Sequence, residues 1–327
     1  MVSLVYNEFF KIIRKKRMLV VTLILLILIP IFTYAQYQAV DSAMKQLGTS
    51  DWRAILQQQI IDQQNRLSSS RIAPEWKEYI RLNIKQQQYY LDHDINPTTP
   101  GSPTFMRKFI EQATELFIPL LVVVLAADLV SSEHAGGTIK LLLTRPVPRW
   151  KILLSKYLSL LLSISLLLLI TAILSYLISG IIFGYRGWDM PVLTGFQMEN
   201  EHLLTENVHM VPQWKYILMA YGLAWFSAIA VGTITFMVSV LVRGTAASMG
   251  AMLAAVVAGT LLSQVAPNWH ELKYIAFINL NLTDYLAGNP ILVEGMNLPF
   301  SLTVLAVWSL VSLIIAFVSF TRRDILA

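Results

Sequence analysis

The chain of 327 residues contains no cysteine and few charged residues. The absence of cysteine excludes disulfides, thiol chemistry and cysteine-ligated metals, although it is compatible with either redox compartment. Only 14% of the residues are charged, whereas a soluble protein of this length has about 25%. The net charge of +5 is modest, and nothing in its placement calls for a nucleic-acid partner.

Recognisable catalytic motifs are also missing. The sequence has no Walker A, HExxH or GxSxG motif, and its five histidines all lie outside the apolar blocks. An ionisable residue at the middle of an apolar block, as a proton relay requires, is not evident. We therefore expect a protein that is not an enzyme and that binds no metal or cofactor of its own.

Hydrophobic residues make up 55% of the chain and occur in long blocks. Blocks of about 18 or more apolar residues predict membrane-spanning helices. The sequence thus predicts an all-α integral membrane protein with six spans, at residues 18–37, 112–131, 152–184, 216–242, 246–266 and 299–320. The first block also has the pattern of a signal peptide, with a basic start and small residues at Thr33 and Ala35, but we expect it to be a retained span.

The distribution of Lys and Arg predicts the orientation. Basic residues gather in residues 1–17, 132–151, 243–245 and 321–327, whereas the links 185–215 and 267–298 carry mainly acids. We therefore expect both termini and the 132–151 loop to be cytoplasmic, with residues 38–111, 185–215 and 267–298 on the outer side.

Residues 38–111 form an unusually long, Gln-rich link. Apolar residues recur in it every four positions, at Trp52, Leu56, Ile60 and again at Trp76, Ile80, Ile84. This spacing predicts an antiparallel helical hairpin that packs on itself, followed by the irregular return "NPTTPGSP". Such a stripe is more typical of a helix core than of a ligand site, although a substrate- or partner-binding hairpin is the alternative.

The N-terminal stretch "SLVYNEFFKIIRKKR" has apolar residues at helical spacing, with Glu8 and the cations largely on the other side. It predicts an amphipathic helix over residues 1–17 that lies on the cytoplasmic membrane surface. The residues expected at that surface are Phe9, Lys11, Ile12, Arg14 and Lys15. The alternative is a basic anchor without a protein partner.

The loop 132–151 lies within "SSEHAGGTIKLLLTRPVPRWKILLSK". Its "TIKLLLT" stretch predicts a short helix along the membrane surface, which Pro146 ends and after which Pro148 begins the next span. Gly136 and Gly137 allow a sharp bend before this helix. Charge alone predicts no more than a positive-inside anchor.

The order of residue types in this loop resembles the cytoplasmic loop of type-two ABC exporter permeases. The resemblance rests on Asp128, Glu133, Gly137, Thr138, Leu141, Leu142, Leu143, Pro146, Arg149 and Lys156. In that family the loop contains a coupling helix, which docks on the ATP-binding subunit. The resemblance implies that Glu133, Gly137, Thr138, Leu142, Pro146 and Arg149 contact that subunit.

The same resemblance implies the rest of the assembly. ATP and magnesium would be bound by separate ATP-binding subunits, and a second copy or a homologous permease would complete the path through a bacterial-type cytoplasmic membrane. The path would lie along spans one, two and five, where Gly250, Gly259 and Thr260 permit close helix approach. The helix before the first span would also contact the ATPase, and residues 267–298 would hold a short re-entrant helix pair.

Two functions without an ATPase partner stay open. These are a secondary transporter and a ligand-sensing membrane protein; an integral membrane enzyme is disfavoured because a catalytic set is missing.

The predicted orientation is tested by protease accessibility in intact cells. A tag placed after Ala327 should be protected from external protease, whereas a tag inserted near Ser69 should be cleaved, because basic loops stay on the cytoplasmic side. The opposite pattern would overturn the orientation.

Overall fold

The computed structural model describes residues 1–49, 51–69, 74–97, 101–138, 146–199, 202–204, 208–266, 269–289, 293 and 295–322. Within these residues six helices are long and apolar enough to cross a membrane. The spans are Arg17–Ser42, Phe117–Ala135, Arg149–Phe183, Gln213–Leu241, Thr245–Val265 and Leu298–Arg322. The predicted helical membrane fold with six spans is confirmed.

The helices follow one another from a short N-terminal helix to a long C-terminal one. They are α1 (Val2–Arg14), α2 (Arg17–Leu47), α3 (Trp52–Leu67), α4 (Pro74–Asp92), α5 (Ser102–Glu115), α6 (Phe117–Ala126), α7 (Ser131–Ala135), α9 (Arg149–Phe183), α10 (Gln213–Leu241), α11 (Thr245–Val265) and α13 (Leu298–Arg322). Between α11 and α13 lie two 3₁₀ turns, η1 (His270–Tyr274) and η2 (Ala276–Asn279), and a single helical turn, α12 (Asp284–Ala287).

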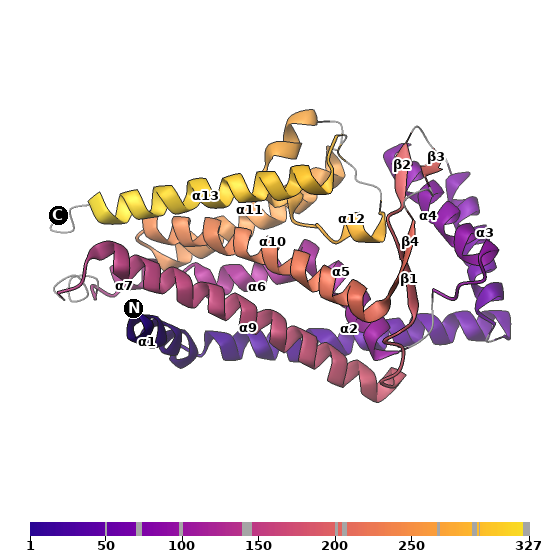
Figure 1. Cartoon of the computed structure of the whole chain (residues 1–327), viewed down its shortest axis with the longest axis horizontal. Coiled ribbons are helices and arrows are strands. Elements are labelled where there is room, and N and C mark those ends of the chain that lie inside the picture. The colour runs from indigo at the N-terminus through magenta and orange to yellow at the C-terminus, as the bar shows by residue number, and fades with distance from the viewer. Residues whose placement is uncertain are drawn as a thin grey trace.

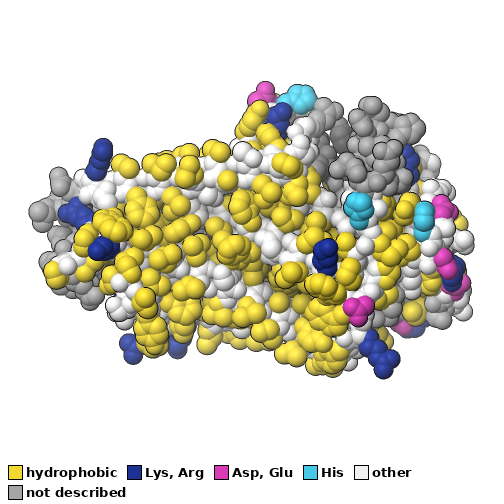
Figure 2. All heavy atoms as spheres, viewed as in Figure 1, with side chains coloured by type: hydrophobic (Ala, Val, Ile, Leu, Met, Phe, Trp, Pro, Cys, Tyr) yellow, Lys and Arg dark blue, Asp and Glu magenta, His cyan; other side chains and the backbone are white. Residues whose placement is uncertain are grey.

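The long helices run side by side and give the molecule two distinct ends (Figure 1). Both termini, α1 and α7 lie at one end, which we call the terminal end. The helices α3 and α4 and the β-strands lie at the other, the hairpin end. On the face shown in Figure 2, hydrophobic side chains cover the middle, and the acidic and histidine side chains that are visible lie toward the hairpin end.

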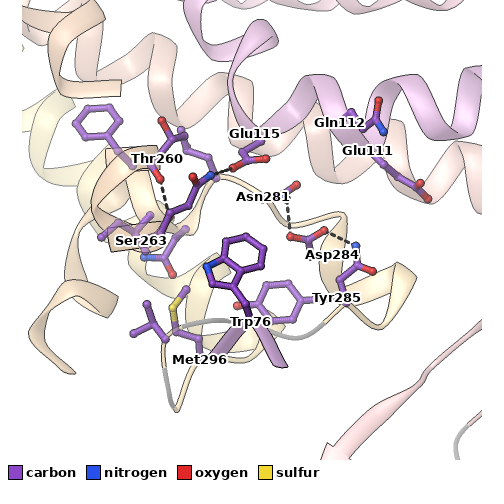
Figure 3. A pocket seen from close by; sticks show the side chains of 17 residues that line it. Trp76, Glu111, Gln112, Glu115, Thr260, Ser263, Asn281, Asp284, Tyr285 and Met296 are labelled. Carbon is purple, nitrogen blue, oxygen red and sulfur yellow. Dashed lines mark hydrogen bonds between the residues drawn. The ribbon is translucent and has the colours of Figure 1, made fainter. Parts of the chain in front are cut away.

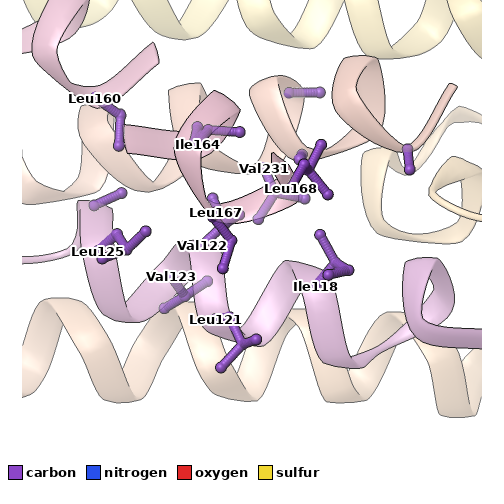
Figure 4. Packing of buried hydrophobic residues seen from close by; sticks show 14 of the residues in the cluster. Ile118, Leu121, Val122, Val123, Leu125, Leu160, Ile164, Leu167, Leu168 and Val231 are labelled. Atoms are coloured by element: carbon purple, nitrogen blue, oxygen red, sulfur yellow. The ribbon is translucent and has the colours of Figure 1, made fainter. Parts of the chain in front are cut away.

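The core of the bundle is built around α6 and α10. Helix α10 contacts α5, α6, α9 and α13. A Cβ added at Gly232 of α10 would meet Ile164 of α9 and Val122 of α6, so three helices meet at this point. Figure 4 shows the apolar side chains of α6 and α9, among them Val122 and Ile164, that fill the space between these helices.

Helix α5 differs from the sequence prediction, which began the second span at residue 112 after an irregular return. The helix begins at Ser102, and its residues Phe105, Phe109 and Ile110 are buried in the bundle. Hydropathy misses this helix because only one of its faces is apolar. The chain breaks at Leu116 before α6, since Pro119 lacks the N–H that would bond the carbonyl of residue 115.

Helix α2 also exceeds its predicted end at residue 37. It continues to Leu47 and ends at Gly48, which has a left-handed backbone with φ of 61°. The last turns are polar, and Lys45 and Asp41 form an ion pair of 2.6 Å on the same helix face. Helix geometry therefore persists beyond the apolar block that hydropathy detects.

The link between α9 and α10 contains β-structure that the sequence analysis missed. Strand β1 (Pro191–Thr194) pairs antiparallel with β4 (His209–Pro212), and β2 (Gln197–Glu199) pairs with β3 (His202–Leu204). Leu193 and Phe196 form a small core with Ile95 beside α4. The β-branched and apolar residues flanking Gly195 were the available signal for a hairpin.

The two helices of the long link pack against each other, as the apolar spacing predicts. Leu56 and Ile60 of α3 and Leu82 and Ile84 of α4 are buried. Trp76 is an exception, because 39% of its surface is exposed.

The described part of the link between α11 and α13 contains the short turns η1, η2 and α12, and the re-entrant helix pair that the resemblance implies stays a prediction. Turn η2 contacts both α11 and α13. At Gly259 of α11 an added Cβ would overlap the Cβ of Phe277 in η2, whereas at Gly250 it would meet open space. Of the two glycines expected to permit close approach, Gly259 therefore does so, toward η2.

Substituting these two glycines tests the packing of η2. Gly259→Ala should destabilise the protein by about 1–3 kcal/mol, because the new methyl group forces the Phe277 backbone away. Gly250→Ala in the same helix should be neutral or stabilising. The thermal unfolding midpoint of the purified protein measures both, and equal midpoints would contradict the close approach.

Candidate functional site

A buried lysine at the terminal end joins three helices. Lys156 lies in the second turn of α9 and is 1% exposed. Its Nζ donates to Oε2 of Glu8 in α1 and to Oε1 of Glu133 in α7, at 2.7 Å each. Lys11 lies over the same carboxylates, 2.6 Å from Oε1 of Glu8 and 3.4 Å from Oε1 of Glu133. Two carboxylates and two ammonium groups thus form one connected unit.

A second group of charges adjoins the first. Asp128, just after α6, has a side chain that is 3% exposed. Its Oδ2 lies 3.2 Å from Nζ of Lys15 and 2.7 Å from Nη2 of Arg17. Lys15 also donates to Oγ of Ser132 at 2.8 Å. We call Glu8, Lys11, Lys15, Arg17, Asp128, Glu133 and Lys156 together the ion cluster; they line one small cavity.

The electrostatics of the ion cluster favour the charged forms of Glu8 and Lys11. Burial alone raises the pKa of Glu8, but Lys156 and Lys11 outweigh it and lower that pKa below its ordinary value of 4.5. Burial alone lowers the pKa of Lys11, and the bonds and charges of Glu8 and Glu133 reverse this and raise it. The Glu8 contribution to stability is therefore present above pH 4.5 and is lost as the pH falls through the lowered pKa.

Backbone contacts place Glu133 and Asp128 for these bonds. The N–H groups of Val130 and Ser131 both donate to Oγ of Ser239 in α10, at 3.1 Å. Ser131 Oγ in turn donates to the carbonyl of Ala127 at 2.8 Å. The junction between α6 and α7 is thereby tied to the bundle core, since buried amides that lose partners are costly.

Of the residues predicted to contact an ATPase, the structure shows some bonded to other parts of this chain and others exposed. Glu133 belongs to the ion cluster, and Arg149 donates from Nη1 to the carbonyl of Thr321 at 3.3 Å. Gly137, Thr138 and Pro146 are exposed at the terminal end. Gly137 has φ of 67°, the left-handed conformation that glycine adopts readily, and no atom lies within 4 Å of an added Cβ. Leu142 lies outside the described residues, and so does the predicted helix of the "TIKLLLT" stretch apart from Thr138.

Helix α1 uses its charged residues differently from the sequence prediction. Glu8, placed on the polar side, is buried against α9, and Ile12 is 4% exposed beside it. Lys11 and Lys15, expected at the membrane surface, bind carboxylates of this chain.

The other predicted membrane-surface residues of α1, Phe9 and Arg14, lie outside its buried face. Phe9 is half-buried, and Arg14 is exposed with its guanidinium 5.4 Å from the ring centre of Phe10. The exposed apolar side of α1 consists instead of Tyr6, Phe10 and Ile13.

Sequence reasoning missed Glu8 and Arg17 as members of the site. Asp128 and Lys156 were included in the loop pattern but given no role there. Their positions at the two ends of that pattern were the available signal. Among the described residues, no three His, Asp or Glu side chains are grouped so that they could hold a metal ion.

The described fold and ion cluster define a helical membrane protein with its charges concentrated at the ends, and comparison with known proteins places it in a family. Residues 80–326 match the family described as "Protein of unknown function (DUF2705)", and the chain belongs to this family. It is 32% identical to "Uncharacterized protein YhcI" of Bacillus subtilis (strain 168), over 99% of each chain.

A second relative supports the membrane assignment. The chain is 26% identical to "Uncharacterized membrane protein YdbK" of Bacillus subtilis (strain 168), over 64% of this chain and 78% of that protein. Together with the six spans, this likeness identifies the chain as a multi-pass membrane protein.

Replacing the central lysine tests the ion cluster. Lys156→Met keeps the length of the side chain but leaves Lys11 alone to balance two largely buried carboxylates, Glu8 and Glu133. We expect a loss of about 3–5 kcal/mol in the free energy of unfolding, because an uncompensated buried charge is strongly destabilising. Thermal or SDS unfolding of the purified protein measures it.

Two further variants serve as controls. Lys45→Met removes an exposed lysine from a surface pair on α2 and should change stability little. The double variant Lys156→Met with Glu8→Gln should recover part of the loss, because it removes one of the stranded charges. If Lys156→Met is as stable as Lys45→Met, the ion cluster does not hold the terminal end together.

Proposed function

We propose that this protein is the membrane-spanning permease subunit of an ATP-binding-cassette exporter. In this proposal the 132–151 loop at the terminal end docks on a separate ATP-binding subunit. A second permease, either a copy of this chain or a homologue, completes the substrate path. ATP and magnesium are bound by the partner subunits.

The observation that carries the proposal is the arrangement of the loop pattern around the ion cluster. Asp128, Glu133 and Lys156 mark the two ends of the pattern, and all three are anchored in the cluster. Gly137 and Pro146, between those ends, are exposed beyond the bundle. Both ends of the loop are thus held firmly, while Gly137 and Pro146 are presented at the surface where a partner can dock.

This anchoring suits a mechanical link. Movement of an ATPase can shift helices in the membrane only if the loop between them does not absorb the displacement. The Lys156 bridge connects the loop to α1 at its entry and to α9 at its exit. A push on the loop would therefore move these helices together, because separating buried paired charges is expensive.

Helix α1 extends the proposed docking surface. It is anchored through Glu8 and exposes Tyr6, Phe10 and Ile13, an apolar stripe at helical spacing. In the proposal this stripe lies on the membrane surface beside the ATPase. The basic end of the molecule and the exposed loop then face the same compartment, which is the cytoplasm by the positive-inside rule.

The alternative is a secondary transporter or a ligand-sensing membrane protein without an ATPase. An acid-lined cavity at the hairpin end, described below, favours ligand binding in either case. Only the proposed permease requires a stable complex with an ATPase at the terminal end, and this requirement separates the candidates.

Two matched glycine substitutions test the docking. Gly137→Val should insert and fold but should abolish most copurification of the ATPase, because a β-branched residue disfavours the left-handed backbone by about 1–3 kcal/mol. Gly48→Val makes the same change at a left-handed, unobstructed glycine after α2, outside the terminal end. It should copurify as the unchanged chain does.

The measurement is affinity purification of the tagged permease coexpressed with the ABC ATPase encoded nearest to its gene, followed by ATP turnover in nanodiscs. Loss of copurified ATPase in Gly137→Val alone supports the proposal. If the unchanged chain captures no ATPase, or if both variants behave as it does, the protein functions without docking through this loop.

A further inference from the structure

The hairpin end contains a cavity of about 360 Å³ that the coupling proposal does not use (Figure 3). Helix α5, the end of α11, the turns between α11 and α13, and the first turn of α4 all contribute to its wall. The lining side chains are Trp76, Glu111, Gln112, Glu115, Thr260, Ser263, Gln264, Phe277, Ile278, Asn279, Leu280, Asn281, Asp284, Tyr285, Asn289, Val293 and Met296.

The charge of the cavity is of one sign. Glu111 and Glu115 lie one turn apart on α5, and Asp284 begins α12 across the cavity. Among the described residues that line it, no lysine, arginine or histidine balances these carboxylates. Asp284 accepts instead from two neutral amides, Nδ2 of Asn289 at 2.8 Å and Nδ2 of Asn281.

A buried amide in the wall has a spare acceptor. Asn279 is 2% exposed, and its Nδ2 donates to the carbonyls of Lys273 at 2.8 Å and Ile275 at 2.9 Å. Its Oδ1 is buried and receives no hydrogen bond from the described residues. A buried acceptor without a donor is costly, so Asn279 adds an unsatisfied acceptor to the acidic wall of the cavity.

Aromatic rings lie beside these acceptors. Trp76 lies within the cavity next to Tyr285 (Figure 3). It belongs to α4, and the same helix is held against the α12 segment by Gln86, whose Nε2 donates to the carbonyl of Gly288 at 2.9 Å. The long link between the first two spans therefore completes the cavity. An indole face beside carboxylates is a favourable place for an organic cation.

The geometry of the cavity favours an organic cation over a metal ion as its ligand. A metal needs several oxygen or nitrogen ligands around one point, and the described residues offer no such group of His, Asp or Glu. The carboxylates come from different walls of a space large enough for a small organic molecule. A ligand that matches this cavity therefore carries a positive charge, hydrogen-bond donors and an apolar body.

We propose that this cavity binds an organic cation, a primary ammonium or guanidinium group on an apolar or aromatic body. The cation lies between Asp284 and the α5 carboxylates, and its body packs on Trp76. The proposal goes beyond the ATPase coupling and does not depend on it, because binding to the permease alone can be measured.

Asp284 makes this binding sensitive to pH. Burial raises its pKa to about 7; the Asn289 hydrogen bond opposes this rise, and the charges of Glu115 and Glu111 add to it. The carboxyl therefore ionises as the pH rises through neutrality, and a cation should bind more tightly above this range than below it.

Binding to the full chain in nanodiscs, without any ATPase, tests the proposal. The probes are 2-phenylethylamine and phenylguanidine, and 2-phenylethanol is the neutral analogue of the first. Titration calorimetry at about pH 8.5 and about pH 5.5 brackets the Asp284 pKa, with empty nanodiscs as the blank. We expect at least one of the cations to bind, at least about tenfold more tightly at the higher pH, and the alcohol to show no specific binding.

Three variants locate the site. Asp284→Asn and Trp76→Ala should each weaken the bound cation by about tenfold or more, and Asp284→Asn should also remove the dependence on pH. Asp41→Asn, which removes a carboxylate of a surface ion pair on α2, should have no effect. The proposal is overturned if neither cation binds above the blank, if the alcohol binds equally well, or if the cavity variants behave as Asp41→Asn does.

Discussion

The terminal end depends on one interaction, the bridge that Lys156 forms between Glu8 and Glu133. A lysine with 1% exposure is tolerated there only because two carboxylates share its charge, and the burial of these carboxylates is tolerated because Lys156 and Lys11 lie against them. The pairing is therefore mutual, and it makes α1, α7 and the start of α9 one unit. This unit therefore holds both ends of the loop between α7 and α9 in place.

One run of chain leads from the cavity at the hairpin end to the ion cluster at the terminal end. Helix α5 contributes Glu111 and Glu115 to the cavity, and α6 follows after the break at Leu116 and leads to Asp128 and the ion cluster. In the proposed exporter this run gives a ligand at the hairpin end a direct structural path to the docking loop. The break at Leu116 is the natural point for the two helices to change their mutual angle.

Much of the fold could be predicted from the sequence because membrane spans are long and uniformly apolar. Helix α5 could not, because its buried face carries Phe105 and Phe109 while Arg107 and Lys108 interrupt the hydropathy. The loop pattern included Glu133 and Lys156, but Glu8, the other carboxylate that Lys156 binds, lies 148 residues away in the sequence, and helix periodicity assigned it to the polar face. Short-range patterns cannot identify such a pairing, and the cavity likewise combines residues from α4, α5, α11 and the turns before α13.

Distance measurement between spin labels tests the central claim that the ion cluster holds α1 and α7 as one unit. Because the chain has no cysteine, labels can be placed uniquely at Tyr6→Cys and Ala135→Cys, with a control pair at Ile181→Cys and Met210→Cys near the hairpin end. The account predicts a narrow distance distribution at the terminal end that broadens when Lys156→Met is added, while the control pair stays narrow. A terminal-end distribution of unchanged width in Lys156→Met would contradict it.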